Sequence, residues 1–279
     1  MMVKLRNLTQ RYPIVFAAVM TLAYVGISQL VSFLVAFVPK GYAADAIFEV
    51  AHMFWPVAVA ILLGYGFALK EKGFGKTFKA ALGVFCAYLL FAVLVVVNAL
   101  NKPGVAWQGW DRILLGVVML LGVGLREDLL YRGVVQNALA IKHAKSARGI
   151  WLTVAVSSAA FGLLHFFNML SGVTFGAACV QVLGAAAMGA VFGAIYLRGG
   201  NIWVPILLHA LVDFLSLFKS TFTTNAGTEI DKINSLDISG LYAMVPLLIL
   251  LTVFLLRKSK HAEILERMEA LRAKYGAEV

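Results

Sequence analysis

Five stretches of the chain lack Asp, Glu, Lys and Arg entirely, and each is long enough to cross a lipid bilayer as a helix. They are residues 12–39, 50–69, 80–101, 149–197 and 238–256. A helical crossing needs about 20 apolar residues. Only 14% of all residues are charged, whereas about a quarter are charged in an ordinary soluble domain. The sequence therefore predicts an all-α, polytopic integral membrane protein.

The uncharged stretches and two interrupted ones predict a bundle of about eight transmembrane helices. Residues 149–197 can hold two helices, with Asn168, Ser171 and Gly172 at the turn. The expected spans are 13–38, 50–69, 79–100, 110–135, 150–170, 173–197, 200–218 and 238–256. They form one predicted domain over residues 1–256, with a motif-bearing core over 110–218.

The basic residues lie in short clusters between the spans, although the net charge of +10 is high. This pattern follows the positive-inside rule and places both termini in the cytosol. It predicts a lipid bilayer as partner, and no nucleic acid. Residues 257–279 predict a basic amphipathic cytosolic tail, in which Glu263 and Arg267 are spaced for an i,i+4 pair. One helical face of this tail carries Ile264, Leu265, Met268 and Leu271.

Two glycines in the sixth predicted span, Gly189 and Gly193, are spaced as a GxxxG pair. Small residues at this spacing allow another helix to approach closely. We interpret the pair as a packing feature.

The fourth predicted span carries four charged residues, Arg126, Glu127, Asp128 and Arg132. Each costs roughly 3 kcal/mol near the centre of a bilayer if it is unpaired. Asp128 and Arg132 are spaced i,i+4, so they can form an ion pair. Glu127 points about 100° away from Asp128 on a helix, which leaves it free for another role.

Histidines in two later spans can reach the same level of the membrane as Glu127. His165 follows Phe161 by one turn, and His209 shares a helix face with Asp213. Counting residues from the expected cytosolic boundaries, at about 1.5 Å per residue, gives similar depths for Glu127 and both histidines. The three groups can therefore meet inside the bundle.

A carboxylate and two imidazoles that converge away from bulk water are suited to activating a water molecule. Glu127 could act as general base, one histidine could transfer the proton, and the other could donate to an oxyanion. Asp213 would orient the His209 ring. Alternatively, Glu127, His165 and His209 could hold a divalent metal such as zinc. A proton-coupled transporter could use the same groups as a relay.

Three segments resemble the motifs of the CAAX protease and bacteriocin-processing (CPBP) intramembrane proteases. Glu127-Asp-Leu-Leu-Tyr-Arg132 is similar to the first motif, Phe161-Gly-Leu-Leu-His165 to the second and His209-Ala-Leu-Val-Asp213 to the third. They occur in order on three separate spans. One position departs from the family pattern, because Asp128 stands where the second glutamate is usual.

The resemblance implies an eight-helix intramembrane endopeptidase. In it, Glu127 and His165 activate water, while His209 and Asp213 stabilise the oxyanion. Asp128, Arg132 and Phe161 have supporting positions. The resemblance favours a mechanism without a metal. It also implies a membrane-associated protein or peptide as substrate, either prenylated or matured as a peptide signal, and a bacterial cytoplasmic membrane as location. A non-catalytic immunity or scaffold protein on the same fold is a further alternative.

Overall fold

The computed structural model describes residues 2–39, 42–101, 106–224, 229–235 and 239–276. These parts of the chain are helical and contain no strand beyond a single bridge between Trp107 and Thr223. The α-helices are α1 (Met2–Arg11), α2 (Pro13–Val35), α3 (Tyr42–Leu62), α4 (Phe74–Leu100), α5 (Trp110–Asp128), α6 (Asn137–His143), α7 (Ala147–Leu164), α8 (Phe175–Gly199), α9 (Trp203–Phe222), α10 (Glu229–Asn234), α11 (Ser239–Leu255) and α12 (His261–Tyr275). The 3₁₀ segments are η1 (Gly66–Lys70), η3 (His165–Ser171) and η4 (Lys258–Lys260), and η2 (Leu129–Gln136) is a π-helix.

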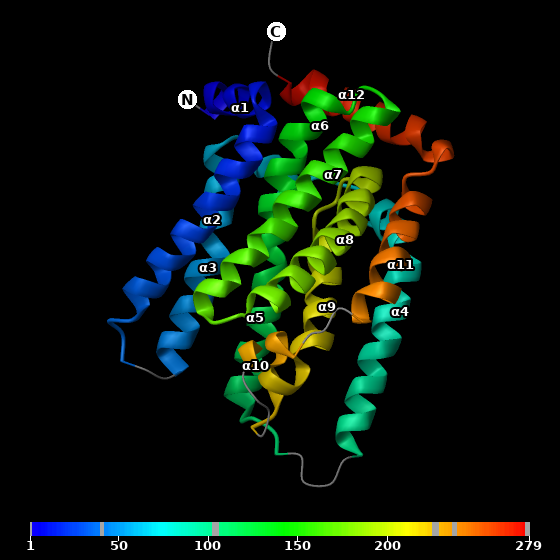
Figure 1. The fold of residues 1–279 in the computed structure, drawn as a ribbon. Coiled ribbons are helices and arrows are strands. Elements are labelled where there is room, and N and C mark those ends of the chain that lie inside the picture. Colours follow the sequence, from blue (N-terminus) through cyan, green and yellow to red (C-terminus); the bar gives the residue numbers. More distant parts are fainter. Residues whose placement is uncertain (1, 40–41, 102–105, 225–228, 236–238, 277–279) are drawn as a thin grey trace.

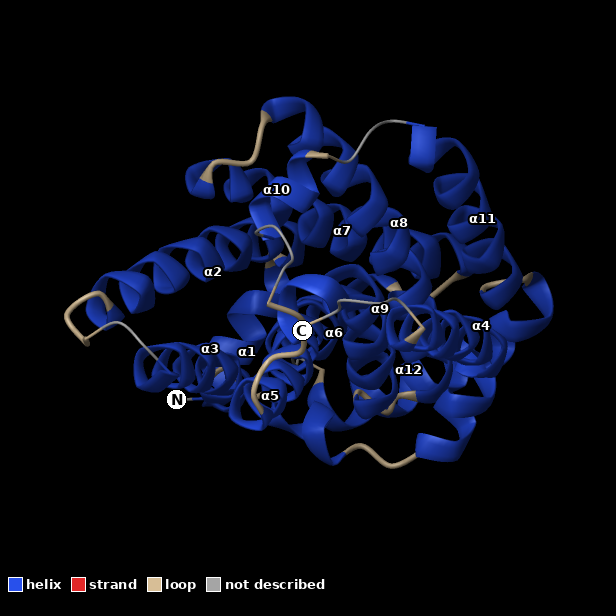
Figure 2. Ribbon diagram, turned by 90° about the horizontal axis from the view of Figure 1, so that it is seen from below, coloured by secondary structure: helices blue, strands red, loops and turns tan. Residues whose placement is uncertain are grey.

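The long helices run side by side as a bundle, with α1 and α12 lying across one end of it (Figure 1). Both termini are at this end. Seen along the bundle, α2 and α3 lie on one side, and α4 and α11 lie on the opposite side (Figure 2). The closest packing joins α7 to α8 and α5 to α9.

Four helical segments are long and apolar enough to cross a membrane: Pro13–Val35, Phe74–Leu100, Ala147–Ser171 and Phe175–Gly199. Two of them lie at the outside of the bundle, since only 22% of the most apolar part of α2 and 17% of that of α4 are buried inside the protein. Shorter apolar helices occur at Ala46–Leu62 and Met244–Leu255. Helices of this kind are those of an integral membrane protein. The number of eight crossings remains a prediction.

Three of the predicted spans differ from the helices that the structure contains. The span at 50–69 was placed too late, because α3 begins at Tyr42 and ends at Leu62. The span at 110–135 is α-helical only to Asp128 and then continues as the π-helix η2. The span at 150–170 is α-helical to Leu164, and η3 follows it. The predicted turn is confirmed at Gly172, whose φ of 98° suits a residue without a side chain.

The tail forms the helix α12, whose predicted apolar face packs onto the bundle. Ile264 and Met268 are fully buried in the same core cluster as parts of α4 and α8. The predicted pair of Glu263 with Arg267 is wrong. Arg267 lies on the inner side of α12 and bonds to Glu71, whereas Glu263 pairs with Lys76 at 3.4 Å. Residues 277–279 of the predicted tail lie outside the described residues.

Candidate active site

The helix that carries the first motif changes its geometry directly after the acidic pair. Residues Leu129–Gln136 form a π-helix, and all eight are buried. Polar side chains bond to carbonyl groups within it: Ser157 Oγ donates to Tyr131 O at 2.9 Å, and Asn137 Nδ2 donates to Gly133 O at 2.8 Å. Such bonds stabilise the wider turns. π-helical turns are rare and occur frequently at functional sites.

Asp128 and Arg132 form the ion pair that their spacing predicts. The Arg132 Nε atom lies 3.1 Å from Asp128 Oδ1, and the two side chains are 1% and 0% exposed. The guanidinium carbon lies 4.3 Å from the ring centre of Phe161 and 5.4 Å from that of Phe192. Arg132 is therefore held between an acidic group and two aromatic rings.

Gly189 leaves the space that Arg132 and Phe161 occupy. A Cβ atom at this position would lie 3.0 Å from Phe161 Cδ1 and 3.2 Å from Arg132 Nη2. At Gly193, a Cβ atom would lie 2.6 Å from Gln136 Oε1. The GxxxG pair thus serves packing, as its pattern indicates, and the segment it packs against is the π-helix.

His209 is fixed by Asp128. Its Nδ1 atom lies 2.8 Å from Asp128 Oδ2. Its Nε2 atom faces two further carboxylates, at 3.8 Å from Glu127 Oε2 and 3.7 Å from Asp213 Oδ2. The 2.8 Å contact of Nδ1 is thus made with Asp128, and the orienting role of Asp213 stays a prediction. Asp128 can reach the ring because α5 approaches α9 closely, where a Cβ atom on Gly124 would lie only 2.6 Å from Ile206 O.

Glu127 has a partner that the motifs do not indicate. The hydroxyl of Tyr24 donates to Glu127 Oε1 at 3.1 Å and accepts from Arg126 Nε at 3.0 Å. Both Tyr24 and Glu127 are buried. Tyr24 lies on α2, 103 residues before Glu127. In the sequence it is one aromatic residue among many apolar ones, so no local signal distinguishes it.

His165 is the first residue of η3, at the end of α7, and is half-buried. Its Nδ1 atom lies 3.1 Å from the carbonyl oxygen of Phe161. Since a carbonyl only accepts, Nδ1 carries a proton and Nε2 of the neutral ring is an acceptor. The Phe161 ring centre lies 5.1 Å from that of His165 and 5.9 Å from that of His209. His165 is also within electrostatic range of Glu127.

The alternative of a metal centre at Glu127, His165 and His209 stays a prediction of the sequence. Among the described residues, no group of three or more His, Cys, Asp or Glu side chains could hold a metal ion. One nitrogen of each ring makes a hydrogen bond within the protein, with Phe161 O in His165 and with Asp128 in His209. The second nitrogen of His209 faces the carboxylates of Glu127 and Asp213.

A family model described as Type II CAAX prenyl endopeptidase Rce1-like matches residues 107–215. This part of the chain is therefore similar to the Rce1-like family. The match confirms the resemblance to the CPBP proteases, and it contains all three motifs, from Glu127 to Asp213. It does not favour the transporter. No curated protein and no solved structure matches the chain.

The matched segment covers α5 to most of α9, and it therefore contains every charged or imidazole group of the site. The hydroxyl of Tyr24 comes from α2, outside residues 107–215. The matched family is one of proteases. The chemistry of this particular chain is argued from its own geometry below.

Proposed function

We propose that the protein is an intramembrane endopeptidase that hydrolyses peptide bonds of membrane-associated proteins or peptides. The observation that supports this most strongly is the pair of Glu127 Oε2 and His209 Nε2, 3.8 Å apart and on different helices. This distance is too long for a direct hydrogen bond. A single oxygen atom can lie within hydrogen-bond distance of both atoms, as a water or a substrate oxygen would.

In the proposed reaction, Glu127 is the general base. Its Oε1 atom accepts from Tyr24 and its Oε2 atom faces the space beside His209. Glu127 removes a proton from water while the water oxygen attacks the carbonyl carbon of the scissile peptide bond. Positioned proton transfer of this kind contributes about 10²–10⁴-fold to a rate.

His209 donates to the oxyanion in this proposal. Its Nδ1–H bonds to Asp128, so Nε2 donates only when the ring carries both protons. The surroundings balance that charge. Three carboxylates (Glu127, Asp128 and Asp213) and three cations (Arg126, Arg132 and the His209 imidazolium) sum to zero. Balanced charge is what a site in a low-dielectric region requires.

His165 transfers the proton to the leaving amine. Its Nε2 atom is an acceptor in the neutral ring, because Nδ1 donates to Phe161 O. It can take the proton from Glu127 and release it to the amide nitrogen as the tetrahedral intermediate collapses and the C–N bond breaks. In this proposal, Glu127 and His165 lie on the water side of the peptide bond and His209 lies on the oxyanion side.

The remaining parts of the proposal concern location and substrate. We propose a bacterial cytoplasmic membrane, with the end that carries α1 and α12 in the cytosol, because the basic clusters between the spans follow the positive-inside rule. The substrate is a prenylated CaaX protein or a membrane peptide. We further propose that hydrolysis needs no metal, so an excess of chelator should leave the rate unchanged; a loss that added zinc restores would contradict this.

Glu127→Gln tests the proposal, because it keeps the size of the side chain and removes the base. In proteoliposomes, cleavage of membrane-anchored peptides, one farnesylated at a C-terminal CaaX sequence and one not, should fall by at least about 10²-fold. The matched control is Glu269→Gln, an exposed position on α12, which should cleave at the original rate. Normal cleavage by Glu127→Gln would reject the mechanism.

A further inference from the structure

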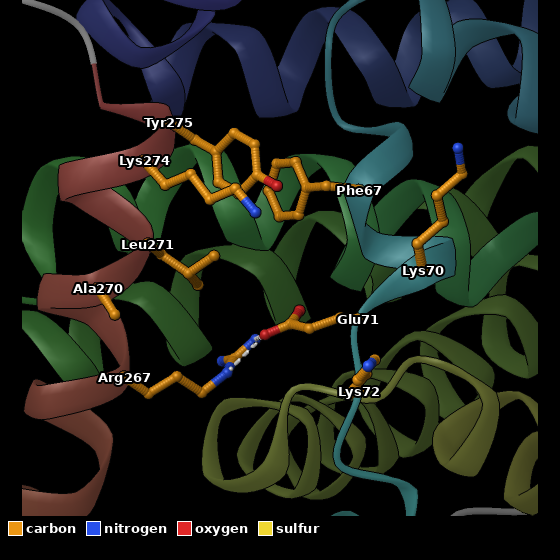
Figure 3. Close-up of a pocket in the computed structure, with 9 residues that line it drawn as sticks. All are labelled: Phe67, Lys70, Glu71, Lys72, Arg267, Ala270, Leu271, Lys274 and Tyr275. Carbon is orange, nitrogen blue, oxygen red and sulfur yellow. Dashed lines mark hydrogen bonds and ion pairs between the residues drawn. The ribbon is translucent and has the colours of Figure 1, made fainter.

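A groove of about 490 Å³ opens between η1 and α12, at the end of the bundle where both termini lie. Figure 3 shows Phe67 and Glu71 on one side of it, facing Tyr275 and Arg267 on the other. The volume falls within the range of roughly 300–1,000 Å³ that is usual for small-molecule sites. The groove is separate from the candidate active site, whose residues do not line it.

The groove carries an excess of positive charge. Lys70, Lys72 and Lys274 line it and are exposed. Within the described ranges, none of the three forms an ion pair. The single carboxylate of the groove, Glu71, is already engaged, since its Oε1 atom accepts from Arg267 Nε at 2.9 Å and Nη2 at 2.6 Å. Three ammonium groups, of which that of Lys274 lies 5.2 Å from the centre of the Tyr275 ring, can therefore attract an anion.

An apolar wall joins the two sides of the groove. The rings of Phe67 and Tyr275 stack with their centres 4.0 Å apart and their planes 9° from parallel. Leu271 lies beside them and is buried. A small hydrated anion would use only the lysines, whereas a phosphate attached to an apolar chain would use the lysines and this wall.

An exposed tryptophan contacts the η1 side of the groove. Trp203, at the start of α9, is 41% exposed, and its indole N–H donates to the carbonyl of Leu69 in η1 at 3.2 Å. Exposed tryptophans at the ends of membrane helices mark the boundary between hydrocarbon and water. Since η1 forms one side of the groove, its lysines meet the headgroup region.

From this combination we infer that the groove binds the phosphate group of an anionic phospholipid. The lysine ammonium groups neutralise the negative charge of the phosphate, and the Phe67–Tyr275 stack contacts the adjoining glycerol and acyl atoms. The recognised group is a phosphate, which a lipid or a free anion can supply. A lipid source agrees better with the apolar wall and with the position at the membrane boundary.

Lipid binding to the full-length protein in detergent tests the inference. Phosphatidylglycerol, phosphatidylcholine and inorganic phosphate are titrated separately, and binding is followed by native mass spectrometry and by the rise in melting temperature. The triple variant K70Q/K72Q/K274Q removes the three charges of the groove. The matched control K4Q/K79Q/K258Q removes three exposed lysines that do not line it.

Phosphatidylglycerol should bind more tightly than phosphatidylcholine, and the groove variant should lose at least tenfold in affinity while the control keeps it. Each basic group near an anionic headgroup contributes severalfold. Inorganic phosphate that binds equally well and competes with the lipid would assign the site to a free anion. Equal losses in both triple variants, or no loss in the groove variant, would overturn the site. Neither readout depends on peptidase activity.

Discussion

Two arginine–carboxylate pairs lie in different parts of the molecule and differ in their surroundings. The inner pair is Asp128 with Arg132, and the outer pair is Glu71 with Arg267. Asp128 and Arg132 are 0% and 1% exposed, and the terminal nitrogens of Arg132 make no hydrogen bond within the described residues. Glu71 and Arg267 are 19% and 11% exposed. Arg267 donates twice to Glu71 and once to Leu197 O, and the second oxygen of Glu71 accepts from Tyr196.

The difference separates a pair that serves a site from a pair that serves assembly. In the outer pair, nearly every polar side-chain atom has a hydrogen-bond partner, as is usual where two elements pack together. The inner pair leaves hydrogen-bonding capacity unused, because aromatic rings cover the guanidinium and the second oxygen of Asp128 is committed to His209. Incomplete satisfaction in a buried cluster is costly, and proteins retain it mainly where function requires it.

The largest effect is expected when the inner pair is broken. Arg132→Met fills a similar space but leaves Asp128 as a buried carboxylate without its cation. Removal of one partner of a buried pair costs about 3–5 kcal/mol. The free energy of unfolding, measured by denaturation in mixed micelles, should fall by this amount. A loss below about 1 kcal/mol would mean that the inner pair behaves like an exposed one.

A smaller effect distinguishes the two carboxylates beside His209. Asp128→Asn removes the charged partner of Nδ1 and should lower kcat by about 10²-fold, with a smaller change in KM. Asp213→Asn alters a group at 3.7 Å and should lower kcat only about tenfold. Rates are compared per folded molecule, since Asp128→Asn also weakens the inner pair. A larger loss in Asp213→Asn would return the orienting role to that residue.

The smallest effect is expected at the outer pair. Arg267→Met removes the hydrogen bonds to Glu71, but water and neighbouring lysines can reach the partly exposed carboxylate. We expect a loss of about 1–2 kcal/mol in the free energy of unfolding and unchanged kcat. The same unfolding measurement used for Arg132→Met gives the comparison directly. A lower kcat with an unchanged free energy of unfolding would show that the outer pair affects the candidate active site.

The sequence was sufficient to predict which segments are helical and two of the contacts within the site. Every predicted span overlaps a helix, since long uncharged runs permit few other structures in a bilayer. The pair of Asp128 with Arg132 followed from i,i+4 spacing alone. The convergence of Glu127 with His209 followed from counting depth along two helices.

Other features could not be read from the sequence. A π-helix adds a residue to each turn, and its bonds from Ser157 and Asn137 depend on how neighbouring helices pack. The contact of Tyr24 with Glu127 joins residues 103 apart in a pattern where any tyrosine could face lipid. The choice of Asp128 over Asp213 as partner of His209 depends on how closely α5 approaches α9.

The inner pair also bears on how the chain enters the bilayer during synthesis. Asp128 and Arg132 are one turn apart, so they can neutralise each other as soon as that turn has left the ribosome, before α9 exists. The charges of Glu127 and Arg126 can likewise meet Tyr24, which is made earlier. The charged segment would insert poorly into the bilayer on its own, but the groups that pair with its charges have already been translated when it is made. In contrast, Glu71 has no Arg267 to pair with until almost the whole protein has been made.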